Sequence, residues 1–423
     1  MAERQQRGAA FMACGAAGNV LEGYDFAVYG YFAAVIGRLF FPSADPAASL
    51  ILSFSAFAVG FLSRPLGGVV FGWMGDRFGR KAVLVWSTLL MAVPSVAIGL
   101  LPTYDAIGVA APVILVVLRL LQGVSVGGEL TGSVTYMSEQ AAGRRPAFTA
   151  SFTVVGGVGG ILLGSAVAAA GNSMLTPEQL ADWGWRLPFL AGALVGIAGM
   201  LLRRHLPDDA PAESEKPSGN PIFEAMRSHT RMMFAGFLIA TFVAVNFYMG
   251  FIYLTTYMNK VAGLDQATSL EINTLSMLVL IAAVVFGGWL ADRVGSRQVL
   301  FLGAGLMILF AWPLVLLIDH DDAVLALAGQ IGLALIVGPY NGAFAYHIGQ
   351  LFPQRLRMSG FSVCYNASFA LFGGTAPMMA QALVSDVGPH ALAFLAIFAA
   401  FASLAGLMLA QTPQDDRQLA PAQ

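Results

Sequence analysis

Long apolar runs dominate the sequence, and each is about as long as a helix that crosses a bilayer. A spanning helix needs about 20 mostly apolar residues. Continuous runs of this length are typical of helices and not of the alternating strands of a β-barrel. The sequence therefore predicts twelve transmembrane helices, at about 14–40, 50–73, 82–101, 107–137, 147–171, 184–204, 230–258, 268–291, 298–318, 323–349, 358–384 and 388–411.

The scarcity of charge supports an all-α integral membrane protein. Only 11% of the residues are charged, whereas soluble domains carry roughly 25%. The net charge of −2 gives no reason to expect a nucleic-acid partner. Cys14 and Cys364 lie far apart without metal-ligand spacing, so neither a metal nor another cofactor is expected. The first apolar run carries Glu22 and Asp25 and lacks a cleavage site, which favours a spanning helix over a removed signal peptide.

The cations indicate which loops face the cytoplasm. Of the 22 lysines and arginines, all but five fall in one set of alternate loops, and Arg38, Arg186 and Lys260 fall in the other. Arg64 and Arg119 lie inside predicted spans. Because cytoplasmic loops carry the excess of cations, we predict that both termini and the loop 205–229 are cytoplasmic. The expected location is a bacterial inner membrane.

An internal repeat divides the chain into two halves. The segment FGWMGDRFGRKAVL at 71–84 is echoed by GGWLADRVGSRQVL at 287–300, with seven identities that all recur 216 positions later. Parallel repeats of this kind occur in secondary transporters. We expect an N-terminal six-helix half at 1–204, a cytoplasmic linker at 205–229, a C-terminal six-helix half at 230–411 and a short tail at 412–423.

Charged residues in and near the repeated turns are candidates for a gate. Glycines allow the close approach and the tight turn, and the charges can pair with the cytoplasmic end of a neighbouring helix. The simpler alternative is that these charges only fix the topology. The candidate gating residues are Asp76, Arg77, Arg80, Glu139, Asp292 and Arg293.

Carboxylates within the predicted spans are candidates for proton coupling, since an ionisable group at the bilayer centre costs roughly 2.5–3.5 kcal/mol on insertion scales. The first span carries Asn19, Glu22, Asp25 and Tyr29, whose spacings of three and four predict one helix face. Asp25 is the first candidate for the proton site and Glu22 the second. Glu129, near the cytoplasmic end of the fourth span, is either a further proton site or a part of the gate.

The two buried arginines suggest how proton and substrate binding are linked. Low dielectric favours the neutral form of a carboxyl group, and a nearby guanidinium favours the ionised form. If a substrate engages the arginine, the carboxylate loses its partner and binds a proton more readily. The alternative is a set of fixed ion pairs that orient the helices.

Arg119 is the favoured anion clamp, because Gln122 lies one turn further on and a guanidinium binds carboxylates bidentately. Arg64 precedes Pro65, which predicts a kink and free backbone carbonyls in the second span. A salt bridge to the first helix is the alternative role for Arg119. The other candidates for substrate binding are Asn19, Tyr29, Asn246, Tyr340, Asn341 and Asn366.

Six further segments carry a family resemblance over nearly the whole chain. They are GNVLEGYDFAVYGYF at 18–32, FLSRPLGGVVFGWMGDRFGRK at 61–81, RLLQGVSVGGE at 119–129, WGWRLPF at 183–189, LFPQRLRMSG at 351–360 and YNASFALFGGTAP at 365–377. With these motifs the chain resembles the metabolite–proton symporters of the major facilitator superfamily. The resemblance implies alternating access about a central site and does not fix the substrate. Gly23 and Leu130 depart from the family pattern, and the tail lacks the heptads of its osmosensing members.

The sequence thus predicts a proton symporter that imports a small organic anion, most simply a di- or tricarboxylate. A zwitterionic osmolyte such as proline or betaine is the first alternative. An efflux antiporter and a non-transporting nutrient sensor are the others. No nucleophile–base pair, phosphate loop or metal cluster favours an enzyme. The expected partners are the solute, protons and the lipid bilayer, and the expected state is a monomer.

Overall fold

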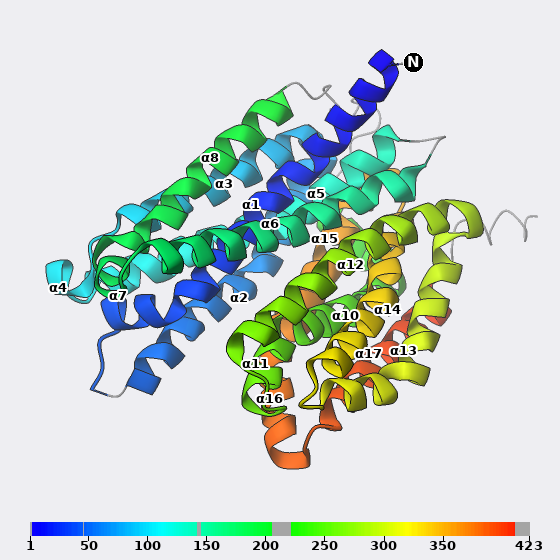
Figure 1. The fold of residues 1–423 in the computed structure, drawn as a ribbon. Coiled ribbons are helices and arrows are strands. Elements are labelled where there is room, and N and C mark those ends of the chain that lie inside the picture. Colours follow the sequence, from blue (N-terminus) through cyan, green and yellow to red (C-terminus); the bar gives the residue numbers. More distant parts are fainter. Residues whose placement is uncertain (1, 45, 142–144, 205–220, 411–423) are drawn as a thin grey trace, which may run out of the picture.

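The computed structural model describes residues 2–44, 46–141, 145–204 and 221–410, and within these ranges all regular structure is helical (Figure 1). Eleven helices are long and apolar enough to cross a membrane. The helix α1 (Ala2–Phe40) adds the twelfth crossing. The predicted all-α, twelve-helix membrane fold is therefore confirmed.

The first six crossings are single helices joined by short connections. They are α1, α2 (Pro46–Phe78), α3 (Arg80–Leu100), α5 (Ala110–Gln140), α6 (Pro146–Met174) and α8 (Arg186–Arg204), with the short α4 (Tyr104–Ile107), α7 (Pro177–Gln179) and η1 (Leu180–Gly184) between them. Pro65 lies inside α2 and the helix continues past it, while the kink expected there stays a prediction.

Two of the last six crossings contain π-helical turns. The crossing predicted at 230–258 consists of α10 (Thr230–Tyr248), the π-helix η3 (Met249–Tyr253) and α11 (Leu254–Lys260). The one predicted at 358–384 consists of α15 (Arg357–Ser368), the π-helix η5 (Phe369–Gly373) and α16 (Ala376–Val387). The remaining elements are α9 (Pro221–Ser228), α12 (Gln266–Val294), α13 (Ser296–Ile318), α14 (Ala323–Gln350), η4 (Gln354–Leu356) and α17 (Ala391–Leu409).

The helices pack in two groups that meet along a few lines of contact. In the first group α1 packs along α6, α2 along α5, and α3 against α5 and α8. In the second, α12 packs along α14, α10 along α17, and α13 against both α14 and α17. The groups meet where α2 packs on α15 and where α6 packs on α12 and α14. The proposed linker at 205–229 falls on α9 and on 205–220, and 205–220 and the tail 412–423 lie outside the described residues.

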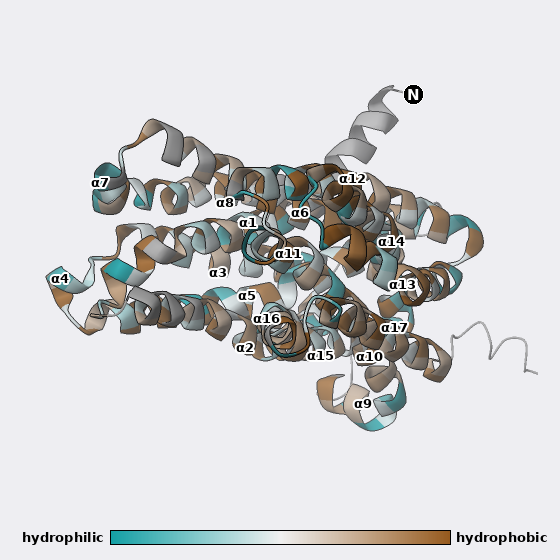
Figure 2. Cartoon of the chain, turned by 60° about the horizontal axis from the view of Figure 1, so that its bottom comes forward, coloured by the Kyte–Doolittle hydropathy of each residue, from teal (hydrophilic) through white to brown (hydrophobic). Residues whose placement is uncertain are grey.

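Apolar side chains cover the outside of the helices, as a lipid environment requires. Leu62, Val93, Leu194 and Leu309 are each more than 60% exposed. Figure 2 shows apolar residues along the length of the crossing helices and hydrophilic residues at the short α4 and α7. The two ends of the bundle are named here by one residue each. The Asp76 face holds the turn between α2 and α3, and the Lys260 face holds the turn between α11 and α12.

Glycines bring α1 and α6 into backbone contact. A Cβ atom added at Gly160 would lie 2.1 Å from the carbonyl oxygen of Val20, whereas one added at Gly159 would meet nothing within 4 Å. The two glycines are neighbours on one helix, so they form a matched pair. Only Gly160 is required by the packing.

We expect Gly160→Ala to destabilise the protein by about 1–3 kcal/mol, because the added methyl group forces α1 and α6 apart. Gly159→Ala should leave the stability unchanged or raise it slightly, since alanine is the better helix former. Thermal unfolding of both variants in detergent checks this. Equal melting temperatures for the two variants would contradict the packing described here.

Candidate functional site

A cavity of about 440 Å³ lies between the two groups of helices. Its size is within the usual range for small-molecule sites, roughly 300–1,000 Å³. The wall is formed by α1, α2, α5 and α6 on one side and by α10, η3, α11, α12, α14, α15, η5 and α16 on the other. Polar residues in it include Asn19, Glu22, Tyr31, Arg64, Thr153, Tyr248, Thr255, Thr256, Asn273, Asn341 and Tyr365.

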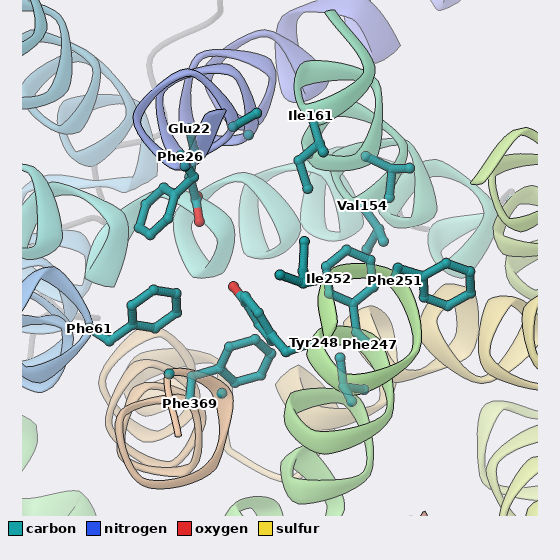
Figure 3. Close-up of a pocket in the computed structure, with 18 of the residues that line it drawn as sticks. Glu22, Phe26, Phe61, Val154, Ile161, Phe247, Tyr248, Phe251, Ile252 and Phe369 are labelled. Carbon is teal, nitrogen blue, oxygen red and sulfur yellow. The ribbon is translucent and has the colours of Figure 1, made fainter. Parts of the chain in front are cut away.

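Glu22 and Arg64 are the only charged side chains among the described residues that line this cavity. Glu22 Oε1 lies 3.6 Å from Arg64 Nη2. The Arg64 side chain is 1% exposed, and that of Glu22 is 17% exposed. Figure 3 shows the carboxylate of Glu22 and the hydroxyl of Tyr248 pointing toward each other from opposite walls. The cavity thus holds one positive and one negative group in a mostly apolar wall.

Aromatic rings surround the Arg64 guanidinium. Its central carbon lies 5.4 Å from the ring centre of Phe61, 5.8 Å from that of Tyr365 and 5.2 Å from that of Phe369. Its Nε and Nη1 atoms have no hydrogen-bond partner among the described residues. Buried nitrogens without partners are costly. Arg64 is therefore the group in the cavity with unused capacity to bind an anion.

A chain of aromatic contacts continues from Arg64 across the cavity. Phe26 packs edge-on against Phe57 at 5.3 Å and against Phe61 at 5.1 Å. Phe61 in turn packs edge-on against Tyr248, whose ring lies 6.0 Å from Phe369 (Figure 3). These aromatic residues of the cavity wall were not predicted from the sequence. Phenylalanines are frequent throughout the apolar runs, so nothing in the sequence distinguishes cavity rings from lipid-facing ones.

Asp25 and Arg119 form a second ion pair, which does not line the cavity. Arg119 Nη1 donates to Asp25 Oδ2 at 2.9 Å, and both side chains are 2% exposed. Gln122 Nε2 donates to the same oxygen at 2.9 Å, and Ser95 donates to Asp25 Oδ1. The Arg119 guanidinium lies 3.6 Å from the ring centre of Tyr29. Arg119 is thus held by its neighbours and lies outside the cavity lining.

The prediction that the four polar residues of the first span share one face was wrong. Asn19 and Glu22 line the cavity, whereas Asp25 and Tyr29 turn toward α3, α5 and α2. Each residue turns the helix by about 100°, so a spacing of three leaves an offset of about 60° that accumulates along the helix. By Asp25 the offset from Asn19 is about 120°, which moves the side chain to the other side of the wall.

Glu129 lies buried between α3 and α5 and does not line the cavity. Its carboxylate accepts hydrogen bonds from Ser87 and, at 3.2 Å, from Ser133. Its neighbour Leu130 does reach the cavity wall.

Of the four predicted polar residues in the C-terminal group, only Asn341 lines the cavity. The Tyr340 hydroxyl donates to the Ile239 carbonyl at 3.1 Å. Asn246 donates to its own helix, at the Phe242 carbonyl. Asn366 donates to the Gly127 carbonyl at 2.6 Å and so joins α15 to α5. Tyr340 and Asn366 therefore join helices to one another, and Asn246 bonds within its own helix.

At the Asp76 face, charged residues connect the two groups of helices. Asp76 accepts hydrogen bonds from the backbone nitrogens of Met358 at 3.2 Å and Ser359 at 2.8 Å, in the first turn of α15. Arg80 lies 3.2 Å from Asp76 and 3.5 Å from Glu139. Glu139 also accepts from Arg357 at 3.1 Å. A carboxylate at a helix N-terminus is stabilised by the free amides and the helix dipole.

The second copy of the repeat makes the corresponding contact. Asp292 accepts from the backbone nitrogens of Ala147 and Phe148, both at 2.9 Å, in the first turn of α6. Arg77 and Arg293 instead lie exposed over the rings of Trp73 and Trp289. Each aspartate thus joins one group of helices to the other at the Asp76 face. The arginines next to them are not part of the described ion pairs.

No group of three or more His, Cys, Asp or Glu side chains that could hold a metal ion occurs in the part of the chain that the structure describes.

Comparison with known proteins places the chain among membrane transporters. The family model of the Major Facilitator Superfamily matches residues 15–365 and 269–422. A putative proline/betaine transporter of Staphylococcus aureus (strain COL) is 36% identical over 88% of this chain and 81% of its own length. A citrate-proton symporter of Klebsiella pneumoniae is 33% identical over 92% of this chain and 88% of its own. The proton:xylose symporter XylE bound to 6-bromo-6-deoxy-D-glucose shares the fold, with a TM-score of 0.78 at 16% identity over 98% of this chain and 99% of that one.

Proposed function

Since the chain belongs to the major facilitator superfamily of transporters, we propose that it is a proton symporter for a small zwitterion with one carboxylate and one alkylated ammonium group. The observation that carries this proposal is the single charged pair, Arg64 and Glu22, in a cavity whose other described lining residues are neutral and include many aromatic rings. The sequence favoured a di- or tricarboxylate, with Arg119 as the anion clamp. With Arg119 held by Asp25, one cation remains for the substrate.

The geometry assigns each part of such a zwitterion a partner. The Nε and Nη1 atoms of Arg64 have no hydrogen-bond partner among the described residues, and each can donate to a carboxylate oxygen. Aromatic ring faces attract quaternary ammonium groups, and Phe26, Phe61 and Tyr248 supply rings near the carboxylate of Glu22. One of the relatives is named a putative proline/betaine transporter, and betaine and proline are solutes of this class.

A di- or tricarboxylate is the second candidate, since one relative is named a citrate-proton symporter. In this case the amides of Asn19 and Asn341 would supplement Arg64 in the cavity. The substrate's second negative charge would lie near Glu22, which would have to be protonated. Acid-dependent uptake would then be steeper for the dicarboxylate than for the zwitterion.

For proton coupling we propose Asp25, with Glu22 second. Asp25 is buried, hydrogen-bonded and paired with Arg119 behind the cavity wall. Its helix α1 also carries Glu22 into the cavity, so a shift of α1 on substrate binding reaches both carboxylates. Glu129, between α3 and α5, is the proposed further proton site.

We also propose that the two six-helix halves, 1–204 and 230–411, alternate about the cavity as a monomer in a bacterial inner membrane. The excess of cations at the Asp76 face supports a cytoplasmic position for that face and for both termini. Asp76, Arg80 and Glu139 on one side and Asp292 on the other would then form the inner gate. Arg77 and Arg293 lie over tryptophans at the same face, where we propose that they anchor it at the lipid interface.

Uptake into proteoliposomes with an inward proton gradient tests this function. The panel contains glycine betaine, proline, citrate and succinate, each with and without a protonophore. We expect proton-dependent uptake of betaine or proline and little of the others. Uptake of citrate or succinate alone would overturn the zwitterion proposal and favour the second candidate. Solute leaving the vesicles in exchange for protons would indicate an antiporter.

A further inference from the structure

Gln330 is an unusual residue for its position, since it is 0% exposed in the apolar helix α14 and does not line the cavity. Its Nε2 donates to the Gly250 carbonyl at 2.9 Å and to Asn273 Oδ1 at 2.8 Å. Its Oε1 has no partner among the described residues. An amide with an unsatisfied buried oxygen stabilises a membrane protein poorly, so stability alone does not explain this residue.

Both partners of Gln330 belong to the substrate cavity. Gly250 lies in the π-helix η3, whose Phe251 and Ile252 line the cavity, and Tyr248 directly precedes this π-helix (Figure 3). Asn273, on the neighbouring helix α12, lines the same cavity. A π-helical turn shifts the backbone hydrogen bonds and often occurs at functional sites. The Gln330 amide therefore joins a backbone irregularity to a neighbouring helix of the same wall.

From this arrangement we propose that Gln330 is a positioning residue that sets the width of the cavity and thereby the size of the ammonium group that is accepted. It holds the carbonyl of the π-helical turn and so fixes the direction in which Tyr248, Phe251 and Ile252 enter the cavity. It also fixes the Asn273 side chain, because it occupies the acceptor oxygen of that amide. The substrate-size part of this inference rests on the proposed function, and the positioning part does not.

Gln330→Leu removes both hydrogen bonds at similar side-chain volume. Tyr340→Phe is the matched control, because Tyr340 is equally buried on α14 and also donates to a backbone carbonyl of the crossing 230–258, that of Ile239 in α10. Ile239 lies in the regular part of α10, three turns before η3. Any general effect of losing a buried hydrogen bond between α14 and the crossing 230–258 should appear in both variants, and an effect on the π-helical turn only in Gln330→Leu.

The first measurement is hydrogen–deuterium exchange of the purified full-length variants without ligand. We expect faster exchange at residues 248–256 in Gln330→Leu and exchange as in the wild type in Tyr340→Phe. Unchanged exchange at 248–256 in Gln330→Leu would overturn the positioning role, whatever the transported solute is.

The second measurement uses thermal shift to determine the affinity for three solutes of graded size. They are N-methylglycine, glycine betaine and N,N,N-triethylglycine. Gln330→Leu should shift the ratio of affinities by about tenfold toward the triethyl compound, and Tyr340→Phe should leave it unchanged. An equal loss of affinity for all three solutes in Gln330→Leu would overturn the size-selecting role. If the wild type binds none of the three, the zwitterion proposal and the size-selecting role both fall, and the exchange experiment still decides whether Gln330 positions the π-helical turn.

Discussion

Asp25→Asn should abolish proton-driven accumulation of the solute and leave exchange of labelled for unlabelled solute intact. Asn resembles the protonated form of aspartic acid, and it can still accept a hydrogen bond from Arg119 and Gln122, the present partners of Asp25. It cannot release a proton, so the variant no longer links solute movement to the gradient. In the wild type, one proton per solute supports about tenfold accumulation for each pH unit.

The measurement compares two assays in proteoliposomes, accumulation under an inward proton gradient and counterflow without one. The accumulation ratio should fall to about one in Asp25→Asn, while the counterflow rate stays near that of the wild type. Because the substitution leaves Arg119 buried without a counter-ion, thermal unfolding is measured as well. Ser95→Ala is the control, since it removes a neutral hydrogen-bond donor to Asp25 and keeps the carboxylate. Intact accumulation in Asp25→Asn would exclude Asp25 as the proton site.

The second large effect is expected for Arg64→Gln, which should weaken solute binding by roughly 100-fold. Hydrogen bonds to a charged group contribute about 1.5–3 kcal/mol each, and the guanidinium offers two nitrogens without other partners. Arg64→Lys retains the charge and loses the planar fork, so we expect an intermediate loss. Both variants leave Glu22 in the cavity, and the loss should therefore be smaller for a solute that also carries an ammonium group than for a plain carboxylate.

Arg119→Gln distinguishes the two arginines. If Arg64 is the clamp, Arg119→Gln should impair accumulation but change the affinity in counterflow less than Arg64→Gln does. The opposite ranking of affinities would restore the sequence-based prediction that Arg119 binds the anion. Equilibrium binding by isothermal titration calorimetry provides the affinities independently of transport.

The fold could be predicted from the sequence because its signals are long-range and redundant. Twelve apolar runs, the alternating cations and the repeat about Asp76 and Asp292 all point to one topology. The π-helical turns η3 and η5 could not be predicted in this way, because one extra residue in a turn leaves the hydropathy of the run unchanged. They place Phe251 and Phe369 in the cavity, so the shape of the site was also beyond the sequence argument.

The candidate site could be predicted in part. The residue types were identified, and Glu22, Arg64, Asn19 and Asn341 line the cavity. The partner of each charge could not be assigned, since two carboxylates and two guanidiniums allow either pairing. The structure pairs Asp25 with Arg119 and Glu22 with Arg64, and this pairing depends on an offset of about 60° along α1 that a rule based on shared faces ignores.

The separation of the Asp25–Arg119 pair from the cavity has a consequence for how the substrate specificity of such a transporter can change. The proposed energy-coupling group lies behind the wall, bonded to α3 and α5, while the proposed cargo touches rings on α1, α2, η3 and η5. Rings such as Phe26, Phe61 or Phe251 can then be exchanged to admit a new cargo without altering the atoms that bind the proton. Relatives named for betaine and for citrate are consistent with a substrate site that is separate from the proton site. Substitutions in the cavity lining could therefore change the substrate while the proton-coupling residues stay unchanged.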